Sequence, residues 1–433
     1  MYLGIDDTDS REGMCTTYVG LVSILNLIED GYYIIGYPRL VRLNPNIPWK
    51  TRGNGAVAIR FGRGAGERIK IGTYKGEDIY AYSREKKGSP RFRLEEFADH
   101  ISGLFVVEDE NTNPGIVFSE KKLREFLYWR AVRSVVELEE VETLLINSKA
   151  EYLKFKLGRG IIGAAASIAW RARRKTYEVL TYSRESDRYV SHESAIALDT
   201  LFPTTFDNYD YQNEYLAIKP NSHTPVLFGI RGTVPDDLLK AVETVESSPY
   251  EAFLIYETNQ ASDDHLVRKK IRDVRPYESV ILRGRVLSKP RRIPGGHVIF
   301  KIGDSTGSIE CAAYEPTKQF RNVVNSLVPG DTVEVYGGVR GDPLTVNLEK
   351  IFIEHAPPYR LKIANPRCPV CGRRMESIGR NRGYRCRRCG TRAGESEAEY
   401  AVVVRNIEGF HEVPVIARRH LSRPLKLMEL RKQ

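Results

Sequence analysis

The sequence contains no long apolar run. None of its hydrophobic stretches approaches the roughly eighteen residues that a membrane-spanning helix needs. It also does not begin with a basic segment followed by an apolar one, which is the pattern of a secretory signal peptide. We therefore expect a cytoplasmic protein without a membrane partner.

Cysteine is scarce, and its spacing argues against disulfides. Only six cysteines occur in 433 residues, and Cys15 and Cys311 stand alone. The other four form two CxxCG turns, a pattern that brings four thiolates to tetrahedral distance around a structural zinc ion. A redox dithiol would need only one such pair. The predicted zinc ligands are Cys368, Cys371, Cys386 and Cys389.

Positive charge and tyrosine, by contrast, are plentiful. The formal net charge is +10, the isoelectric point is near 9.1, and the chain has 24 tyrosines. A length of 433 residues gives room for about three domains. A basic surface with exposed aromatic rings suggests a nucleic-acid partner, although charge alone would fit many other proteins.

The first twenty residues carry the strongest sign of chemistry. An apolar strand at residues 2–5 ends in Asp6, Asp7 and Asp9, which repel one another unless a cation lies between them. Hydroxyl residues including Thr16 follow, and then a helix predicted at residues 17–30. Because helix N-termini attract anions, this order favours a metal and phosphate site. The alternative is a polar turn whose side chains only cap the helix.

A second candidate is the loop at residues 44–55, NPNIPWKTRGNG. Two prolines and two glycines give it a specially shaped backbone, and loops often carry binding residues. We interpret it as a substrate-binding loop, with a well-packed connecting loop as the alternative. The candidate residues are Asn44, Asn46, Ile47, Pro48, Lys50 and Arg52.

A third candidate is the glycine-rich stretch at residues 154–170, KFKLGRGIIGAAASIAW. It resembles a glycine turn at a helix N-terminus that approaches a phosphate, with tight helix packing as the alternative. It is not a Walker A motif, because no GK[ST] follows the glycines. The candidate cofactor-binding residues are Lys156, Arg159, Gly160 and Gly163.

The order of elements predicts two further modules. Strand, helix and strand across residues 225–257 suit a small α+β unit of ferredoxin-like type. Three strands, a helix and two strands across residues 279–353 are the order of an OB-fold, which binds single-stranded nucleic acid. A purely structural β-module is the alternative for the second of these.

Three other segments carry weaker expectations. Residues 62–103 look irregular and basic apart from a helix at residues 94–104. His265 has no cysteine or second histidine nearby, so we expect it at the surface or as a cap rather than as a ligand. The basic tail at residues 409–433 is expected to order only on a partner.

Taken together, these motifs resemble one family along nearly the whole chain. Its other matching segments are YPRLVRL, DENTNPG, FPTTFDN, EPTKQFRNV and ARRHLSRPL, in the same order. The family is the archaeal 2-agmatinylcytidine synthetase that acts on the minor isoleucine tRNA with a CAU anticodon. The resemblance implies a multidomain α+β fold. Its expected domains are an atypical kinase domain at 1–195, a ferredoxin-like domain at 196–274, an OB-fold at 275–358, and a zinc ribbon with a basic tail at 359–433.

The resemblance also implies an activity. The family uses ATP to join agmatine to C2 of the wobble cytidine, so that the anticodon reads AUA. It implies ATP, Mg²⁺ and Zn²⁺ as cofactors, with Asp6, Asp7 and Asp9 as Mg²⁺–ATP ligands or base, and Asp7 and Asp9 as the magnesium ligands. Thr16 matches the threonine that the family autophosphorylates. The loop at residues 44–55 matches one near the agmatine and cytidine pocket.

Two other classes of protein compete with this interpretation. A non-catalytic binder of tRNA or single-stranded DNA would use the OB-fold and ribbon, but would gain nothing from three carboxylates near a polyanion. A generic small-molecule kinase would use the acidic turn but leave the two C-terminal modules without a role.

Overall fold

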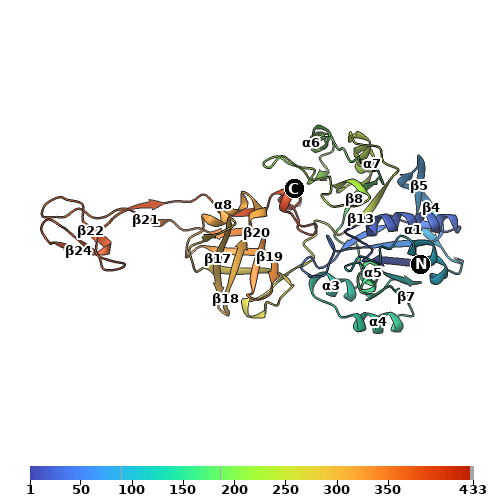
Figure 1. Cartoon of the computed structure of the whole chain (residues 1–433), viewed down its shortest axis with the longest axis horizontal. Coiled ribbons are helices and arrows are strands. Elements are labelled where there is room, and N and C mark those ends of the chain that lie inside the picture. The colour runs from blue at the N-terminus through green and yellow to red at the C-terminus, as the bar shows by residue number, and fades with distance from the viewer. Residues whose placement is uncertain (89, 186, 430–433) are drawn as a thin grey trace.

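The computed structural model describes residues 1–88, 90–185 and 187–429. Figure 1 shows three parts along its longest axis: a large body built on one sheet, a β-barrel beside it, and a stalk with a small terminal lobe beyond the barrel. Within the described ranges, no helix is both long and apolar enough to cross a membrane.

A single sheet of eleven strands runs through the large body. Its first strand in the chain, β1 (Tyr2–Asp6), pairs antiparallel with β4 (Gly55–Tyr74) on one side and with β6 (Gly115–Ser119) on the other. The other strands are β2 (Tyr33–Ile35), β3 (Arg39–Arg42), β5 (Glu77–Lys86), β7 (Glu151–Lys154), β8 (Thr176–Tyr182), β9 (Thr205–Phe206), β12 (Val226–Gly232) and β13 (Ala252–Thr258). β3 pairs parallel with β13, which makes the sheet continuous from the N-terminal strands to the later ones.

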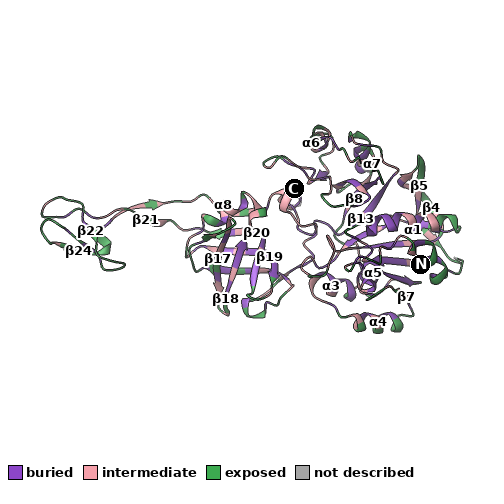
Figure 2. Ribbon diagram, viewed as in Figure 1, coloured by how far each residue is buried: buried purple, intermediate pink, exposed green. Residues whose placement is uncertain are grey.

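Helices cover both faces of this sheet because its strands are apolar on both sides. Val57 and Ile59 of β4 pack in the core cluster that contains the helices α1 and α2, whereas Ala56 and Ala58 face the cluster of α3, α4 and α5. A third cluster lies under α6 and α7. The helices are α1 (Thr16–Glu29), α2 (Leu94–Ser102), α3 (Phe126–Arg133), α4 (Leu138–Asn147), α5 (Gly160–Ala169), α6 (His192–Leu201) and α7 (Pro235–Thr244). Figure 2 shows these strands as buried between exposed helix faces.

The expectation of an irregular segment after residue 62 is wrong. β4 continues to Tyr74 and turns into β5, forming a long antiparallel hairpin. Glycines and charged residues hid this hairpin in the sequence, because much of it is exposed and needs no apolar alternation. The helix expected at residues 94–104 is confirmed as α2.

The β-barrel confirms the predicted OB-fold. β15 (Ser279–Val286) pairs with both β17 (His297–Asp304) and β19 (Thr332–Arg340), and β18 (Gly307–Ala313) and β20 (Thr345–His355) close the ring. Along the chain, the helix α8 (Phe320–Asn325) lies between β18 and β19. Three short strands extend the sheet: β14 (Leu266–Arg268), β16 (Arg291–Ile293) and β26 (Gly409–Glu412).

The surface position expected for His265 is wrong. Its side chain is fully buried, and its Nε2 lies 3.0 Å from the Glu349 carboxylate of the barrel. Burial alone would raise the pKa of Glu349. The pKa instead falls to about 2, because interactions with His265, Arg419 and Lys350 favour the charged carboxylate. The histidine follows the large body directly, so it forms part of the joint between that body and the barrel.

The terminal lobe sits on a two-stranded stalk. β21 (Tyr359–Ala364) and β25 (Glu399–Val403) pair antiparallel and lead away from the barrel (Figure 1). The lobe contains three very short strands, β22 (Glu376–Ser377), β23 (Tyr384–Arg385) and β24 (Arg392–Ala393). Its core is little more than Met375 and Tyr384 with the cysteines, which is too small to fold without a further cross-link.

For residues 409–429, the expectation that the tail orders only on a partner is also wrong; residues 430–433 lie outside the described residues. After the stalk, β26 returns to the barrel and pairs with β20, and Leu421 packs in the core under α3 and α5. Further along, α9 (Leu425–Glu429) places Leu427 against Phe206 of the large body. Backbone pairing and buried leucines therefore anchor this segment within the molecule.

The remaining short strands are β10 (Tyr209–Asp210) and β11 (Tyr215–Leu216).

Gly4→Ala tests the close packing of β1 on α5. A Cβ at Gly4 would lie 2.3 Å from the carbonyl oxygen of Ala164, so backbone would have to move. We expect this change to lower the free energy of unfolding by about 1–3 kcal/mol, measured by chemical denaturation. Gly103→Ala is the matched control, because its Cβ would meet nothing within 4 Å and its φ is −62°. Equal stability of the two variants would contradict this account.

Candidate active site

A small acidic cleft opens where β1 ends. Its volume is about 80 Å³, and its walls are the acidic turn after β1, the start of α1, residues 47–55, and α5. Most residues predicted from the sequence line it: Asp6, Asp7, Asp9, Thr16, Ile47, Lys50, Arg52, Arg159 and Gly163. Five predicted residues are not in its lining: Asn44, Asn46, Pro48, Lys156 and Gly160. The fold thus brings three separate sequence motifs to one place.

The carboxylates at the end of β1 are crowded and poorly neutralised. Asp6 is pressed against α5 so closely that a Cβ on Gly163 would lie 1.8 Å from its Oδ2. Burial, and then repulsion by Asp7, raise the pKa of Asp6 well above its usual range. Burial and repulsion by Asp9 raise the pKa of Asp7 to about 7, even though Asn113 donates hydrogen bonds to it. Such a group of carboxylates favours a bound cation.

Thr16 is held directly by Asp9. The Asp9 Oδ1 accepts hydrogen bonds from the backbone N–H of Thr16 at 2.7 Å and from its hydroxyl at 3.2 Å. Thr8 donates a further hydrogen bond to the Thr16 hydroxyl oxygen at 3.1 Å. Asp9 therefore satisfies the first N–H of α1 from across the turn, and it fixes the hydroxyl at the edge of the cleft.

The loop at residues 44–55 connects the barrel with the cleft. At its base, Asn44 donates to the carbonyl of Tyr277 at 2.9 Å, and Asn46 donates to the hydroxyl of Ser279 at 2.8 Å. At its tip, the Trp49 ring lies 4.3 Å from the guanidinium of Arg159. The two asparagines therefore hold the loop in place, whereas its tip faces the cleft.

Arg52 lies beyond this tip and ties the loop to the acidic turn. Its guanidinium donates to the carbonyls of Ser10 and His223. Lys50, in the same loop, has its pKa lowered to about 8 by burial and by the nearby Arg419. Two cationic side chains therefore stand opposite the carboxylates.

The glycine-rich segment packs closely against its neighbours. The N–H of Gly160 donates to the carbonyl of Asn113 at 3.0 Å, and a Cβ on Gly160 would lie 2.3 Å from the backbone nitrogen of Gly115. Lys156 donates to the carbonyl of Asp109 at 2.7 Å. Lys156 and Gly160 thus hold the start of α5 in position, and Arg159 and Gly163 face the cleft.

Asp109 is a supporting residue whose role the sequence did not reveal. Its Oδ2 accepts hydrogen bonds from the Ser10 hydroxyl at 2.9 Å and from the Arg11 N–H at 2.7 Å. These bonds, with others from Asn111, outweigh its desolvation and lower its pKa to about 2. The turn at residues 109–111 therefore holds the acidic turn after β1 in shape.

A larger basic cavity adjoins the acidic cleft. Its volume is about 310 Å³, and Asp9, Thr16, Arg52 and Gly55 line both spaces. This cavity was not predicted, because its walls come from β3, the segment after α6 and the C-terminal tail. The ARRHLSRPL motif was its only signal. Its cationic side chains are Arg42, Arg52, Lys219, Arg231 and Arg418.

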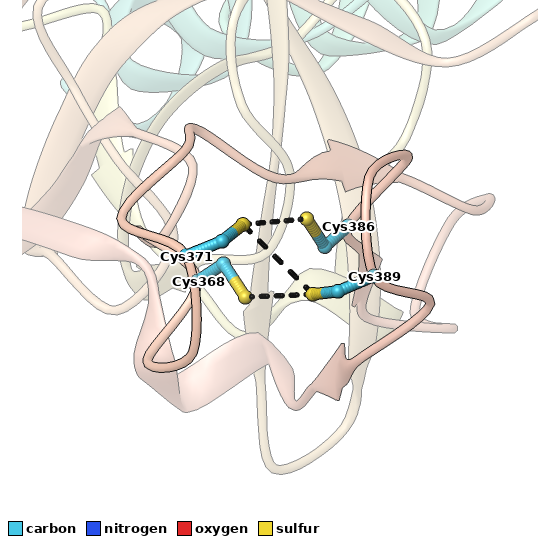
Figure 3. Close-up of side chains that lie close together, drawn as sticks. All are labelled: Cys368, Cys371, Cys386 and Cys389. Carbon is cyan, nitrogen blue, oxygen red and sulfur yellow. Dashed lines mark hydrogen bonds between the residues drawn. The ribbon is translucent and has the colours of Figure 1, made fainter.

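The four predicted zinc ligands come together in the terminal lobe (Figure 3). The Sγ atoms of Cys368 and Cys389 lie 3.4 Å apart, as do those of Cys371 and Cys386. All four sulfurs lie within 4.8 Å of one another. Tetrahedral Zn–S bonds of about 2.3 Å imply sulfur separations of roughly 3.8 Å, so the four thiols fit a zinc ion with a small adjustment.

Comparison with known proteins now identifies the family. A model described as the TiaS TCKD domain matches residues 2–157, and one described as the TiaS FLD domain matches residues 158–265. An OB-fold nucleic acid binding domain matches residues 280–354, and the TiaS C-terminal zinc ribbon domain matches residues 365–407. The chain belongs to the TiaS family. The predicted α+β class with an OB-fold and zinc ribbon is thereby confirmed.

Members of the TiaS family resemble this chain along its full length. The isoleucine-tRNA 2-agmatinylcytidine synthetase TiaS of Methanocaldococcus jannaschii is 41% identical and covers 99% of each chain. A solved complex of TiaS with its isoleucine tRNA and ATP is 39% identical, covers 98% of this chain and 96% of that one, and has a TM-score of 0.80. A complex of TiaS with the same tRNA, AMPCPP and agmatine is 36% identical over the same shares, with a TM-score of 0.78.

Cys386→Ser tests the zinc site. Losing one thiolate removes a ligand from a lobe whose own core is small, so we expect the purified protein to lose its zinc and the lobe to unfold locally. Metal analysis and hydrogen exchange of the lobe amides measure the two effects. Cys311→Ser, in a thiol buried in the barrel core away from the lobe, should leave zinc content unchanged. Unchanged zinc in Cys386→Ser would contradict the ligand assignment.

Proposed function

We propose that this chain joins agmatine to the wobble cytidine of the minor isoleucine tRNA with a CAU anticodon, using ATP, so that the tRNA reads AUA codons. The observation that carries this proposal is the full-length similarity to synthetases named for that reaction. The cleft supports it, because it brings the acidic turn, Thr16 and the predicted substrate loop together. A tRNA substrate is also consistent with a cytoplasmic location.

The acidic turn suits magnesium. Within the described part of the chain, only the four cysteines form a group of three or more ligands close enough to enclose an ion, so the aspartates do not build a full cage. Mg²⁺ commonly takes one or two carboxylates and completes its shell with water and substrate phosphates. Asp7 and Asp9 would supply those carboxylates, and the ion would neutralise charge on the transferred phosphoryl group.

The nucleotide and the substrates would share the two adjoining spaces. From α5, Arg159 and Gly163 would approach the nucleotide in the cleft, and Lys156 and Gly160 would hold that helix end in place. The cations of the basic cavity complement phosphates of the nucleotide or of the anticodon backbone. In the loop, Ile47, Pro48, Lys50 and Arg52 would form the wall for agmatine and cytosine, positioned by the anchored Asn44 and Asn46.

The reaction that fits these groups has two steps. The C2 carbonyl oxygen of cytosine attacks the γ-phosphorus of ATP, which forms a C2–O–P bond and releases ADP. The agmatine primary amine then attacks C2, the C2–O bond breaks, and phosphate leaves. The amine must also lose a proton, and a carboxylate of the acidic turn that does not hold the metal would take it. Arg52 and Lys50 would stabilise the negative charge that develops.

Asp9→Asn tests the function and the carboxylate site together. The substitution keeps the size of the side chain but removes a charge, so we expect modified cytidine to fall at least about 100-fold while tRNA binding persists. The assay incubates the protein with the CAU-anticodon isoleucine tRNA, ATP, Mg²⁺ and agmatine, and detects the nucleoside by mass spectrometry. Absence of product with the unaltered protein would refute the function, and full turnover in the variant would refute the carboxylate role.

We also propose that the Thr16 hydroxyl oxygen attacks the γ-phosphorus of a further ATP, so that an O–P bond forms, ADP leaves and the hydroxyl proton passes to Asp9, whose Oδ1 lies 3.2 Å away. Thr16 lines both spaces and begins α1, where backbone N–H groups stabilise added negative charge. If it served only as a helix start, its loss would cost about 1 kcal/mol of stability and leave turnover intact.

Thr16→Ala and Thr17→Ala separate these roles. Thr17 is the matched control because it lines the basic cavity only and contacts the Cys15 thiol rather than Asp9. With ATP radiolabelled at its γ-phosphate, Thr16→Ala should lose covalent label and most agmatine transfer, whereas Thr17→Ala should keep both. Label that persists in Thr16→Ala but disappears in Thr17→Ala would move the site by one residue.

A further inference from the structure

The ARRHLSRPL motif lies between the barrel and the large body, far along the chain from every other part of the active site. We call residues 409–425 the C-terminal strap. It begins as β26 on the barrel and then crosses to the large body, where the N–H groups of Ala261 and Asp263 donate to the carbonyls of His420 and Leu421 at 2.8 and 2.9 Å. Figure 1 shows the C-terminal end of the chain between these two parts. The strap is therefore fixed on both sides of their joint.

The strap brings one histidine ring into the wall of the basic cavity. The Nδ1 of His420 lies 3.1 Å from Nη2 of Arg231. Burial, Arg42 and Arg231 hold the pKa of His420 well below its ordinary value, so the ring is neutral. Since arginine has no acceptor atom, Arg231 can only donate to Nδ1, which requires the tautomer in which Nδ1 carries no hydrogen; Oε1 of Gln260, which can only accept, lies 3.3 Å from the same nitrogen.

Arg231, which contacts the His420 ring, belongs to a buried group of charged residues. Its Nε donates to one oxygen of Glu178 at 3.2 Å, and Nη2 of Arg42 lies 3.5 Å from the other. Glu178 is only 3% exposed, and Gln260 also donates to it. The two guanidinium groups thus share the Glu178 carboxylate, Nη1 of Arg231 also lies 3.8 Å from Asp207, and its Nη2 faces His420.

The His420 ring also contacts the loop at residues 44–55. A Cβ on Gly53 would lie 3.0 Å from the His420 ring, so the loop passes in direct contact with it. Arg52, the preceding residue, lines both the acidic cleft and the basic cavity. One imidazole ring therefore contacts both Arg231 of the cavity and the loop that carries Arg52.

We propose that His420 is a positioning residue for the reaction proposed above. Its ring accepts a hydrogen bond from Arg231 and packs against Gly53. These two contacts keep Arg42 and Arg52 in position in the cavity that Thr16 also lines. Through the strap, this arrangement depends on the joint between the barrel and the large body. The activity measurement for this role rests on the proposed function, whereas the hydrogen-exchange measurement is independent of it.

Three variants of the full-length protein separate positioning from simple loss of packing. His420→Ala removes both contacts. His420→Asn places an amide oxygen close to where Nδ1 lies, so it can still accept from Arg231. His411→Ala is the matched control, because this histidine lies in the same strap, bonds to the carbonyl of Ile407 at 2.8 Å, and lines neither space.

The first measurement is agmatine incorporation into the CAU-anticodon isoleucine tRNA, with kcat and the KM for tRNA determined separately. We expect His420→Ala to lower kcat about 10- to 100-fold with little change in the KM for tRNA. His420→Asn should recover most of the lost rate, and His411→Ala should match the unaltered protein. Normal kcat in His420→Ala, or no recovery in His420→Asn, would overturn the proposal.

The second measurement is hydrogen exchange of the amides at residues 51–54, which needs no substrate. We expect faster exchange in His420→Ala than in His420→Asn or His411→Ala, because the loop loses its support. Equal exchange in all three variants would overturn the inference. If the unaltered protein makes no modified cytidine but the exchange difference is seen, the proposed function fails and the structural role of His420 stands.

Discussion

The close approach of α5 to β1 is the constraint on which the active region depends. Gly4 of β1 touches the backbone of Ala164, and Gly163 touches the carboxylate of Asp6. With side chains at either position, helix and strand would separate, and Asp6 would no longer be enclosed at the end of β1. The same contact encloses Asp6, the first of the three aspartates. The raised pKa values of Asp6 and Asp7 follow from this packing rather than from the side chains alone.

Charges of both signs meet in the active region. The acidic cleft carries three aspartates together with Lys50, Arg52 and Arg159, and the basic cavity beside it carries five lysine or arginine side chains, with Asp9 and Thr16 lining both spaces. A nucleotide with its metal and a cationic amine need opposite local charges within one small volume. Carboxylates and cations that line the same adjoining spaces meet that need, and burial strengthens both interactions by excluding water.

Buried polar contacts keep the barrel in a defined position on the catalytic body. Lys350 is only 1% exposed and pairs with Asp263 at 2.6 Å, and His265 pairs with Glu349. Asn44 and Asn46 add hydrogen bonds from the substrate loop itself. Buried pairs of this kind require accurate geometry, because the loss of one partner leaves an unpaired charge that water cannot solvate. An RNA held by the barrel would therefore be presented to the cleft at a fixed distance.

Local sequence patterns determined the elements whose signal is short-ranged. The apolar run before the aspartates predicted β1, the two CxxCG turns predicted the thiol cluster, and the order of strands around one helix predicted the barrel. In the site, the acidic turn, the loop and Arg159 were found because each is a compact motif. The hairpin of β4 and β5 was missed, because glycines and exposed charges erase the alternation that marks a strand.

Tertiary structure alone decided the features that join distant parts of the chain. His265 was expected at the surface or as a cap because no cysteine or second histidine lies near it in sequence, yet Glu349 lies beside it across the joint. Distance along the chain also hid the basic cavity, whose arginines come from β3, β12 and the strap, and hid the role of Asp109 in supporting the first acidic turn. Periodicity and motif spacing report on neighbours within a few residues. Contacts between residues far apart in the chain depend on how the sheet, barrel and strap pack together.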